Sequence, residues 1–445
     1  MEKKRVIIIG AAGRDFHNFN VCYRDNTGVA VAGFTAAQIP GIANRIYPPS
    51  LAGKNYPEGI QIYNELDLAA LIREHEVDEV VFSYSDVTYH HVMNLASIAN
   101  SAGAAFKLLS PRQTMIKSKK PVVAVCAIRT GCGKSQTSRY IIEILRGLGI
   151  RTIPIRHPMP YDHDLASQAV QRFATLDDLK LHRCTIEEME EYEPHIHSGG
   201  VIYAGVDFAA ILAQAEKEAN VIMWDGGNND TSFYVPDLLI VVADALRPGH
   251  ELKYYPGADN LRMADVIIIN KVDSANPADV EEIIANAKRV NPNALIIQAK
   301  SPVTVDKPGA ISGKRVLVIE DGPTCTHGGM KTGAGTVAAL QCGAKIVDPR
   351  PYLQGSLNDT FRIYPEIGAL LPAMGYGPDQ IQDLANTVEA MHRAGEIEVV
   401  VIGTPIDLRR VIPLPCEAVR VSYELEEIGD ELRRVLSERI LPLVN

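Results

Sequence analysis

The sequence contains few of the features that mark secreted, membrane or metal-binding proteins. Its 445 residues include one tryptophan and seven cysteines, and no two cysteines form a Cys-x-x-Cys pair. No apolar run approaches the roughly 18 residues that cross a bilayer. The first residues, Met-Glu-Lys-Lys-Arg, lead directly into a short apolar segment that lacks a leader-like region. These absences predict a reduced, soluble, cytoplasmic protein with no membrane partner.

The sequence also lacks an excess of basic residues. It has 54 Asp and Glu against 44 Lys and Arg, a formal net charge of −10. No global positive field is therefore available for nucleic acid, and we expect no nucleic-acid partner. A site for a phosphorylated ligand must gather its basic residues locally.

What the sequence does contain is a phosphate-binding loop. Residues 122–128 are apolar, as in a buried strand, and a glycine-rich turn ending in Lys-Ser follows before an amphipathic, helix-like segment. In this order of elements, backbone N–H groups surround the phosphates of a nucleotide. A glycine-rich turn that binds no ligand is the alternative. The residues expected to contact the nucleotide are Thr130, Gly131, Cys132, Gly133, Lys134, Ser135 and Gln136.

The loop matches a short variant of the P-loop rather than the standard form. Ile128 occupies the position of the first consensus glycine, and Arg129 stands where the short variant has an extra lysine. Lys134 is expected to neutralise the β- and γ-phosphates, and the Ser135 hydroxyl to bind Mg²⁺. We therefore expect a nucleoside triphosphate with Mg²⁺ at this loop.

Two further strand ends carry residues suited to the same nucleotide. Asp225 follows the apolar residues 221–224, and its carboxylate is expected to hold Mg²⁺ directly or through water. Asn270, Lys271 and Asp273 form an Asn-Lys-x-Asp tetrad after residues 266–269. An ionised Asp accepts hydrogen bonds from guanine but not from the N1 of adenine, so the tetrad favours GTP. An ordinary strand-to-loop exit is the alternative.

Basic residues in two other loops are candidates for the substrate. Arg156 and His157 follow the strand expected after the P-loop helix, at the sheet edge where ligands bind in open α/β sheets. A guanidinium group and an imidazolium group both suit phosphate oxygens. A solvated basic turn is the alternative. His327 and Lys331, in a glycine-rich loop of the C-terminal part, form a second candidate anion site.

The order of the predicted strands and helices indicates an α/β protein with three parts. Residues 1–118 predict a Rossmann-like domain, residues 119–300 a parallel-sheet P-loop NTPase domain, and residues 301–445 an α/β portion that extends the P-loop sheet or folds separately. Gly10 and Gly13 follow the first strand, but the full Gly-x-Gly-x-x-Gly pattern is missing. A dehydrogenase that binds a dinucleotide there is thus an alternative with weak support.

Several segments together resemble the cyclic 2,3-diphosphoglycerate synthetase family. They are residues 129–139, 156–161, 225–230 and 320–323, and the similarity spans the chain. The resemblance implies a ligase that uses ATP and Mg²⁺ to close 2,3-diphosphoglycerate into its cyclic pyrophosphate, with release of ADP and phosphate.

The same resemblance implies a role for each motif. Lys134 and the loop amides would bind the triphosphate, Ser135 and Asp225 would serve the metal, and Arg129 would stabilise charge on the γ-phosphoryl group. Arg156 and His157 would contact the phosphorylated substrate. The ATP implied by the family and the GTP favoured by Asp273 are both left open.

A regulatory GTPase of the dimeric SIMIBI type is the competing hypothesis. The tetrad Asn270 to Asp273 and the position of Arg129 support it, whereas the absence of a His- or Cys-rich tract counts against a metallochaperone. In either case we expect a homodimer.

Overall fold

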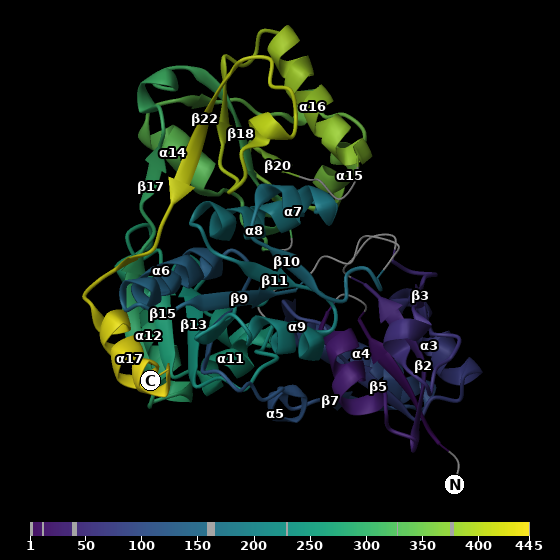
Figure 1. The fold of residues 1–445 in the computed structure, drawn as a ribbon. Helices are drawn as coiled ribbons and strands as arrows, with labels where there is room; N and C mark the ends of the chain where they lie inside the picture. The colour runs from purple at the N-terminus through teal and green to yellow at the C-terminus, as the bar shows by residue number, and fades with distance from the viewer. Residues whose placement is uncertain are drawn as a thin grey trace.

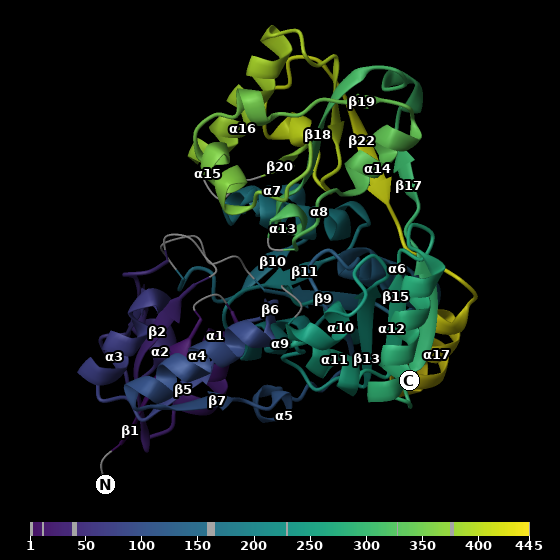
Figure 2. The same cartoon turned by 180° about the vertical axis from the view of Figure 1, so that it is seen from behind.

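The computed structural model describes residues 3–10, 13–37, 42–157, 165–227, 230–326, 328–373 and 378–444. They form three α/β parts, each built on its own sheet (Figures 1 and 2). This confirms the predicted α/β class.

The N-terminal part contains a mostly parallel six-stranded sheet. Its order is β3-β4-β2-β1-β5-β7, and only β3 runs antiparallel to its neighbour. The strands are β1 (Lys4–Ile9), β2 (Val29–Ala36), β3 (Ile46–Tyr47), β4 (Ile60–Asn64), β5 (Glu79–Phe82) and β7 (Ala105–Leu108). The helices are α1 (Arg14–Asn18), α2 (Pro49–Ala52), α3 (Leu68–Glu74), α4 (Tyr89–Ala102) and α5 (Pro111–Thr114).

The middle part contains a nine-stranded sheet in the order β10-β11-β9-β12-β8-β13-β15-β16-β23. All neighbours are parallel except at the two edges, where β10 and β23 run antiparallel. The strands are β8 (Val122–Ala127), β9 (Thr152–Arg156), β10 (Gln171–Phe173), β11 (Ile202–Ala204), β12 (Val221–Trp224), β13 (Leu238–Asp244), β15 (Val266–Asn270), β16 (Leu295–Lys300) and β23 (Glu426–Glu427).

The central strands of this sheet are covered on both faces. Every residue of β8, β13 and β15 is buried, which explains their continuous apolar sequences. The helices are α6 (Lys134–Gly147), α7 (Leu176–Leu181), α8 (Ile186–His197), α9 (Phe208–Ala215), α10 (His250–Lys253), α11 (Gly257–Met263) and α12 (Pro277–Val290). Because β12 pairs with β8 in parallel, Asp225 and the glycine-rich loop emerge at the same edge of the sheet.

The C-terminal part has a separate six-stranded sheet, in which β20 pairs with β18 beside the main order β17-β22-β21-β18-β19. The strands are β17 (Val303–Val305), β18 (Arg315–Asp321), β19 (Lys345–Ile346), β20 (Leu371–Ala373), β21 (Val399–Ile402) and β22 (Glu417–Tyr423). The helices are α13 (Gly322–Cys325), α14 (Ala334–Gln341), α15 (Ser356–Ile363) and α16 (Pro378–Arg393). After β22 the chain returns to the middle part, where Leu432 and Leu436 of α17 (Glu431–Arg439) join its core, before α18 (Leu441–Val444).

Helix α8 lies between the middle and C-terminal parts (Figure 1). Its Ile186 belongs to the C-terminal core, while Tyr192 packs with β10 and β11 of the middle sheet. The two parts therefore enclose the space at the end of the P-loop.

Candidate functional site

The glycine-rich loop connects β8 to α6, as the sequence predicts. Gly131 and Gly133 have φ angles of 81° and 100°, values that residues with a side chain rarely adopt. A Cβ atom on Gly133 would also collide with the side chains of Asn270 and Gln136. The tight turn that directs the loop's amides therefore depends on glycine at this position.

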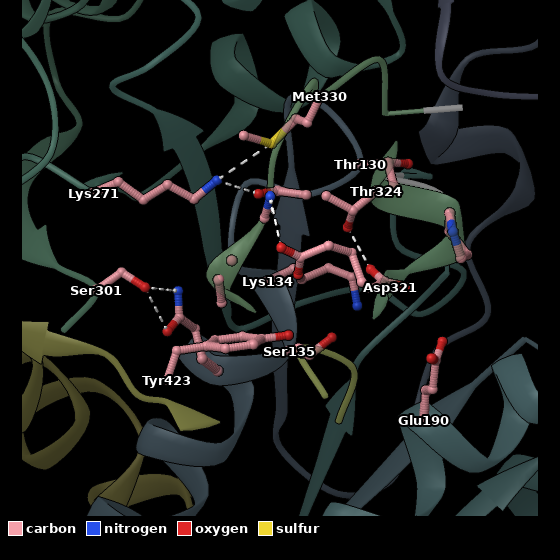
Figure 3. A pocket seen from close by; sticks show the side chains of 18 of the residues that line it. Thr130, Lys134, Ser135, Glu190, Lys271, Ser301, Asp321, Thr324, Met330 and Tyr423 are labelled. Atoms are coloured by element: carbon pink, nitrogen blue, oxygen red, sulfur yellow. Dashed lines mark hydrogen bonds between the residues drawn. The ribbon is translucent and has the colours of Figure 1, made fainter. Parts of the chain in front are cut away.

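A cavity of about 210 Å³ opens beside this loop. The loop and Arg156 form one wall, α8 contributes another, and residues from β18 to α14 with Tyr423 close the far side. In Figure 3, Lys271 and Ser301 lie on the left of the cavity, and Asp321 and Glu190 on the right. The cavity thus joins the predicted phosphate site to the C-terminal part.

Lys134 and Arg156 meet on the carboxylate of Asp225. Lys134 Nζ lies 2.7 Å from Asp225 Oδ1, and Arg156 Nη1 lies 3.0 Å from Oδ2. The Ser138 hydroxyl donates a third hydrogen bond, at 2.8 Å. Burial disfavours the charged form of Asp225, but Lys134 and Arg156 outweigh burial and hold the pKa of this carboxyl well below its usual range.

Asp225 itself is 0% exposed and is not among the residues that line the cavity. The carboxylate that meets Ser135 is instead Glu191, whose Oε2 accepts a hydrogen bond from the Ser135 hydroxyl at 2.9 Å. Glu191 also forms an ion pair with Arg156. The structure therefore brings Asp225 to Lys134 as predicted, but not into the space next to Ser135.

Helix α8 supplies three glutamates to the cavity. A capping box formed by Thr185 and Glu188 starts the helix, and Glu187, Glu190 and Glu191 follow at positions i, i+3 and i+4 on one face. None of the residues predicted to bind ligand or metal lies on this helix. The spacing of these three residues was the signal that could have found them.

Glu190 lies next to a second carboxyl group in the wall of the cavity. Glu190 and Asp321, at the end of β18, are hydrogen-bonded to each other, and their oxygens accept the hydroxyls of Thr404 and Thr324. Burial and the nearby Asp321 raise the pKa of Glu190 well above its ordinary value. In the described part of the chain neither carboxyl forms an ion pair with Lys or Arg. A hydrogen bond between two carboxyls requires a proton, so the pair carries one negative charge and can give up that proton when a cation binds.

Glu320, the neighbour of Asp321, has a structural role. Its carboxylate accepts the N–H groups of Gly333, Gly335 and Thr336 at 3.1, 3.1 and 2.6 Å, and the Thr336 hydroxyl at 2.9 Å. These bonds fix the start of α14 over the cavity.

The Asn-Lys-x-Asp tetrad supports the glycine-rich loop directly. Asn270 donates to the carbonyl of Cys132 at 2.9 Å, and Lys271 Nζ donates to the carbonyl of Gly131 at 2.5 Å. Asp273 is exposed, and one of its oxygens accepts the Ser301 N–H at 3.0 Å. Gln136 also contacts Ser301, at 3.1 Å. Of the tetrad residues predicted to bind nucleotide, only Lys271 lines the cavity.

Arg129 lines the cavity but is held by the N-terminal part. Its Nε lies 2.7 Å from Asp86, and its guanidinium lies 3.7 Å from the ring centre of Tyr254. The same aspartate accepts the Thr130 hydroxyl at 2.6 Å. The predicted role of Arg129 on the γ-phosphoryl group therefore requires it to act from within this set of contacts.

The other residues predicted to bind substrate divide differently. Arg156 lines the cavity, whereas His157 is half-buried, packs against Trp224 and Phe233, and does not line it. Burial, followed by Arg14 and Arg156, lowers the pKa of His157 well below 6.5, so it supplies no imidazolium there. Lys331 is exposed outside the cavity lining, and His327 lies outside the described residues.

The N-terminal glycine turn packs against the middle part. A Cβ on Gly13 would lie 3.5 Å from His157 Nδ1, and the following Arg14 is buried in an ion pair with Asp230. These contacts use the turn for packing and do not support the dinucleotide alternative. Ala11 and Ala12 lie outside the described residues.

Two features are absent from the residues that the structure describes. No described helix is long and apolar enough to cross a membrane. Within the same ranges, no group of three His, Cys, Asp or Glu side chains has the arrangement of a metal site. All seven cysteines are free thiols.

Comparisons with known proteins identify relatives of this chain. It is 60% identical over 439 residues to "Arginine synthetase ArcE" of Thermococcus kodakarensis, covering 98% of this chain and 97% of that protein. Residues 212–298 match the family model of the CobW/HypB/UreG nucleotide-binding domain. This segment contains Asp225 and the Asn-Lys-x-Asp tetrad.

Solved structures give weaker similarities. The structure of LpxK from Aquifex aeolicus in complex with ATP is 12% identical, with a TM-score of 0.41 over 79% of this chain and 96% of that one. The hydrogenase maturation factor HypB from Archaeoglobus fulgidus is 18% identical, with a TM-score of 0.26 over 41% and 81%.

The curated relative corrects one prediction from the sequence. It is named for arginine synthesis, which conflicts with the synthesis of cyclic 2,3-diphosphoglycerate. That predicted activity, with 2,3-diphosphoglycerate as the substrate, is wrong.

Proposed function

Because the chain belongs to the family of the arginine synthetase ArcE, we propose that it is a nucleotide-dependent ligase that forms arginine. One observation carries this proposal: a single cavity holds Lys134 and Ser135 of the glycine-rich loop together with the paired carboxyls of Glu190 and Asp321. The first pair suits a triphosphate and the second suits a cation.

The acidic wall matches the charge of arginine. A guanidinium group carries five N–H donors in a planar fork and binds carboxylates through two parallel hydrogen bonds. Glu190 is buried and Asp321 is half-buried, and a charged pair is stronger in such surroundings than in water. A cation between them replaces the hydrogen bond that the two carboxyls form with each other.

A triphosphate is useful for this product because it activates an oxygen. We propose that the substrate is the ureido analogue of arginine, in which oxygen replaces one terminal guanidino nitrogen. The ureido oxygen attacks the γ-phosphorus, the bond to the β-phosphate oxygen breaks, and the nucleoside diphosphate leaves. Ammonia then adds to the central carbon, the C–O bond breaks, and inorganic phosphate leaves with the former ureido oxygen.

The residues of the cavity divide this chemistry between them. Lys134 and Arg156 neutralise the transferring phosphoryl group, which is the main requirement of such a transfer. The activated ureido group becomes a cation, and Glu190 with Asp321 stabilises that charge. The same carboxyls are suited to accept the proton that the incoming nitrogen loses. The catalytic role of Arg129 stays a prediction.

Mg²⁺ suits the donors next to the glycine-rich loop. A serine hydroxyl and a carboxylate are hard oxygen ligands, and Mg²⁺ typically binds one or two carboxylates with phosphate oxygens and water. When bound, the ion would offset the charge of the phosphates. Lys134, the loop amides and Arg156 would orient the triphosphate.

We propose ATP as the nucleotide. Asn270 and Lys271 bind the carbonyl groups of the glycine-rich loop, and Asp273 already accepts the Ser301 N–H. The tetrad therefore has a supporting role that does not require guanine. GTP is the alternative nucleotide, and in that case the second oxygen of Asp273 would accept from guanine.

The proposal is tested by incubating the protein with ATP, Mg²⁺, ammonium and the ureido analogue. We expect arginine, ADP and phosphate in equal amounts, measured by chromatography and a phosphate assay. A Lys134→Ala variant should form none of them. Release of ADP and phosphate without arginine would contradict the proposal and favour the regulatory NTPase.

A further inference from the structure

The Ser135 hydroxyl and the carboxylate predicted to share its metal do not meet. The structure places Glu191 beside Ser135, with Oε2 2.9 Å from the hydroxyl oxygen. Glu191 lines the cavity, and its side chain keeps 27% of its surface exposed.

Asp225 is already fully engaged. It accepts hydrogen bonds from Lys134 and Ser138 and an ion pair from Arg156, and its side chain is 0% exposed. If Asp225 turned toward the cavity, the buried Lys134 would lose its ion pair and the buried Arg156 one of its two, which is strongly unfavourable. Asp225 therefore acts as an anchor for Lys134 and Arg156.

Glu191 is held in place but has an open side. Arg156 fixes one carboxylate oxygen through an ion pair, and the rigid helix α8 carries the side chain. The cavity beside Ser135 is where the β- and γ-phosphates would lie on the loop. A carboxylate at this position completes a set of hard oxygen donors.

We propose that Glu191, together with the Ser135 hydroxyl, binds the Mg²⁺ that accompanies the nucleotide. This inference rests on the proposed function only in taking a nucleotide as the ligand of the loop. Glu191 is adjacent to Glu190, so the metal and the arginine-binding carboxyl share one turn of α8. Entry of the nucleotide with its metal thereby fixes the helix that binds the other substrate.

The test measures metal binding and requires no turnover. Mn²⁺ is titrated into the protein in the presence of ADP, and free Mn²⁺ is followed by its electron paramagnetic resonance signal. The variants are Glu191→Gln, which keeps the side-chain volume, and Glu193→Gln, a matched control on the same helix. Glu193 pairs with Arg410, 3.2 Å away, and does not line the cavity.

Glu191→Gln should raise the Mn²⁺ dissociation constant by about tenfold or more, since even indirect supports of a metal ligand contribute that much. Affinity for ADP without metal should stay within a few-fold of that of the unchanged protein, and Glu193→Gln should alter neither quantity. A Ser135→Ala variant should also weaken Mn²⁺ binding. The double variant should bind Mn²⁺ only slightly more weakly than either single variant.

Two outcomes would overturn the inference. Unchanged Mn²⁺ affinity in Glu191→Gln would exclude Glu191 as a ligand. Tighter ADP binding without metal would mean that Glu191 merely competes with the phosphates for Ser135 and Arg156. If the unchanged protein does not bind ADP at all, the proposed function itself is refuted. This result is distinguishable from a failure of the inference about Glu191 alone.

Discussion

Replacing Glu190 by glutamine tests whether the acidic wall binds a guanidinium group. The substitution keeps the shape of the side chain, which is 5% exposed. A glutamine can still accept the Thr404 hydroxyl and can donate to Asp321. We therefore expect the fold to remain intact, while position 190 can no longer lose a proton and become negatively charged when a cation binds.

The expected loss follows from the charge of each ligand. A hydrogen bond to a charged group contributes about 1.5–3 kcal/mol, which corresponds to about 10-fold to 150-fold in affinity. The ureido group is neutral, whereas the activated intermediate and the guanidinium group of arginine are cations. The loss should therefore fall on arginine affinity and on kcat, with a smaller effect on the KM of the ureido analogue.

Calorimetric titration of arginine into the protein saturated with ADP measures the first quantity, and steady-state kinetics measure the others. Glu193→Gln is the control, because it removes a glutamate from the same helix outside the cavity. The reasoning would be refuted by unchanged arginine affinity, or by an equal loss of affinity for ATP. Either result would mean that Glu190 does not contact the guanidinium group.

Three further predictions concern other parts of the structure. Lys134→Ala should reduce turnover to background, because it removes the lysine that lines the cavity at the start of α6, where the phosphates are expected; turnover near that of the unchanged protein would argue against the phosphate site. Asp273→Asn should leave ATP-dependent turnover within a few-fold if the tetrad only supports the loop, whereas a large selective loss with GTP would show that Asp273 reads the base. Burial, followed by Arg14, lowers the pKa of His17 from 6.5 to about 3. The unfolded chain therefore binds one more proton between these values, and the free energy of unfolding should fall by up to about 1.4 kcal/mol per pH unit as the pH drops below 6.5. Urea titrations at several pH values measure how the free energy of unfolding changes with pH. In His17→Phe this slope should decrease by the contribution of one bound proton, and an unchanged slope would contradict the lowered pKa of His17.

The sequence predicts the strand, turn and helix around the glycine-rich loop, whereas the nucleotide contacts of its residues stay predictions. The apolar residues 122–128 and 266–269 read directly as buried strands, and the glycines and Lys-Ser between strand and helix require a local turn that tertiary packing does not alter. Local chemistry was sufficient there. The Rossmann-like character of the N-terminal part and the homodimer stay predictions.

The acidic wall of the cavity was not predictable from local sequence in the same way. An acidic helix is usually a solvated surface, and only the C-terminal sheet that covers α8 turns Glu190 and Glu191 toward a cavity. The pairing of Arg129 with Asp86 joins residues from different parts of the chain. His157 follows Arg156 at a strand end, but it packs against a cluster of aromatic rings and does not line the cavity. Such placements depend on packing between parts, which sequence motifs do not encode.

Labelling the ureido oxygen with ¹⁸O tests the coupling of nucleotide and arginine most directly. If the oxygen attacks the γ-phosphorus, the phosphate released with arginine must carry the label, and mass spectrometry of that phosphate detects it. The account predicts one labelled oxygen in each phosphate. Arginine formed together with unlabelled phosphate would contradict it.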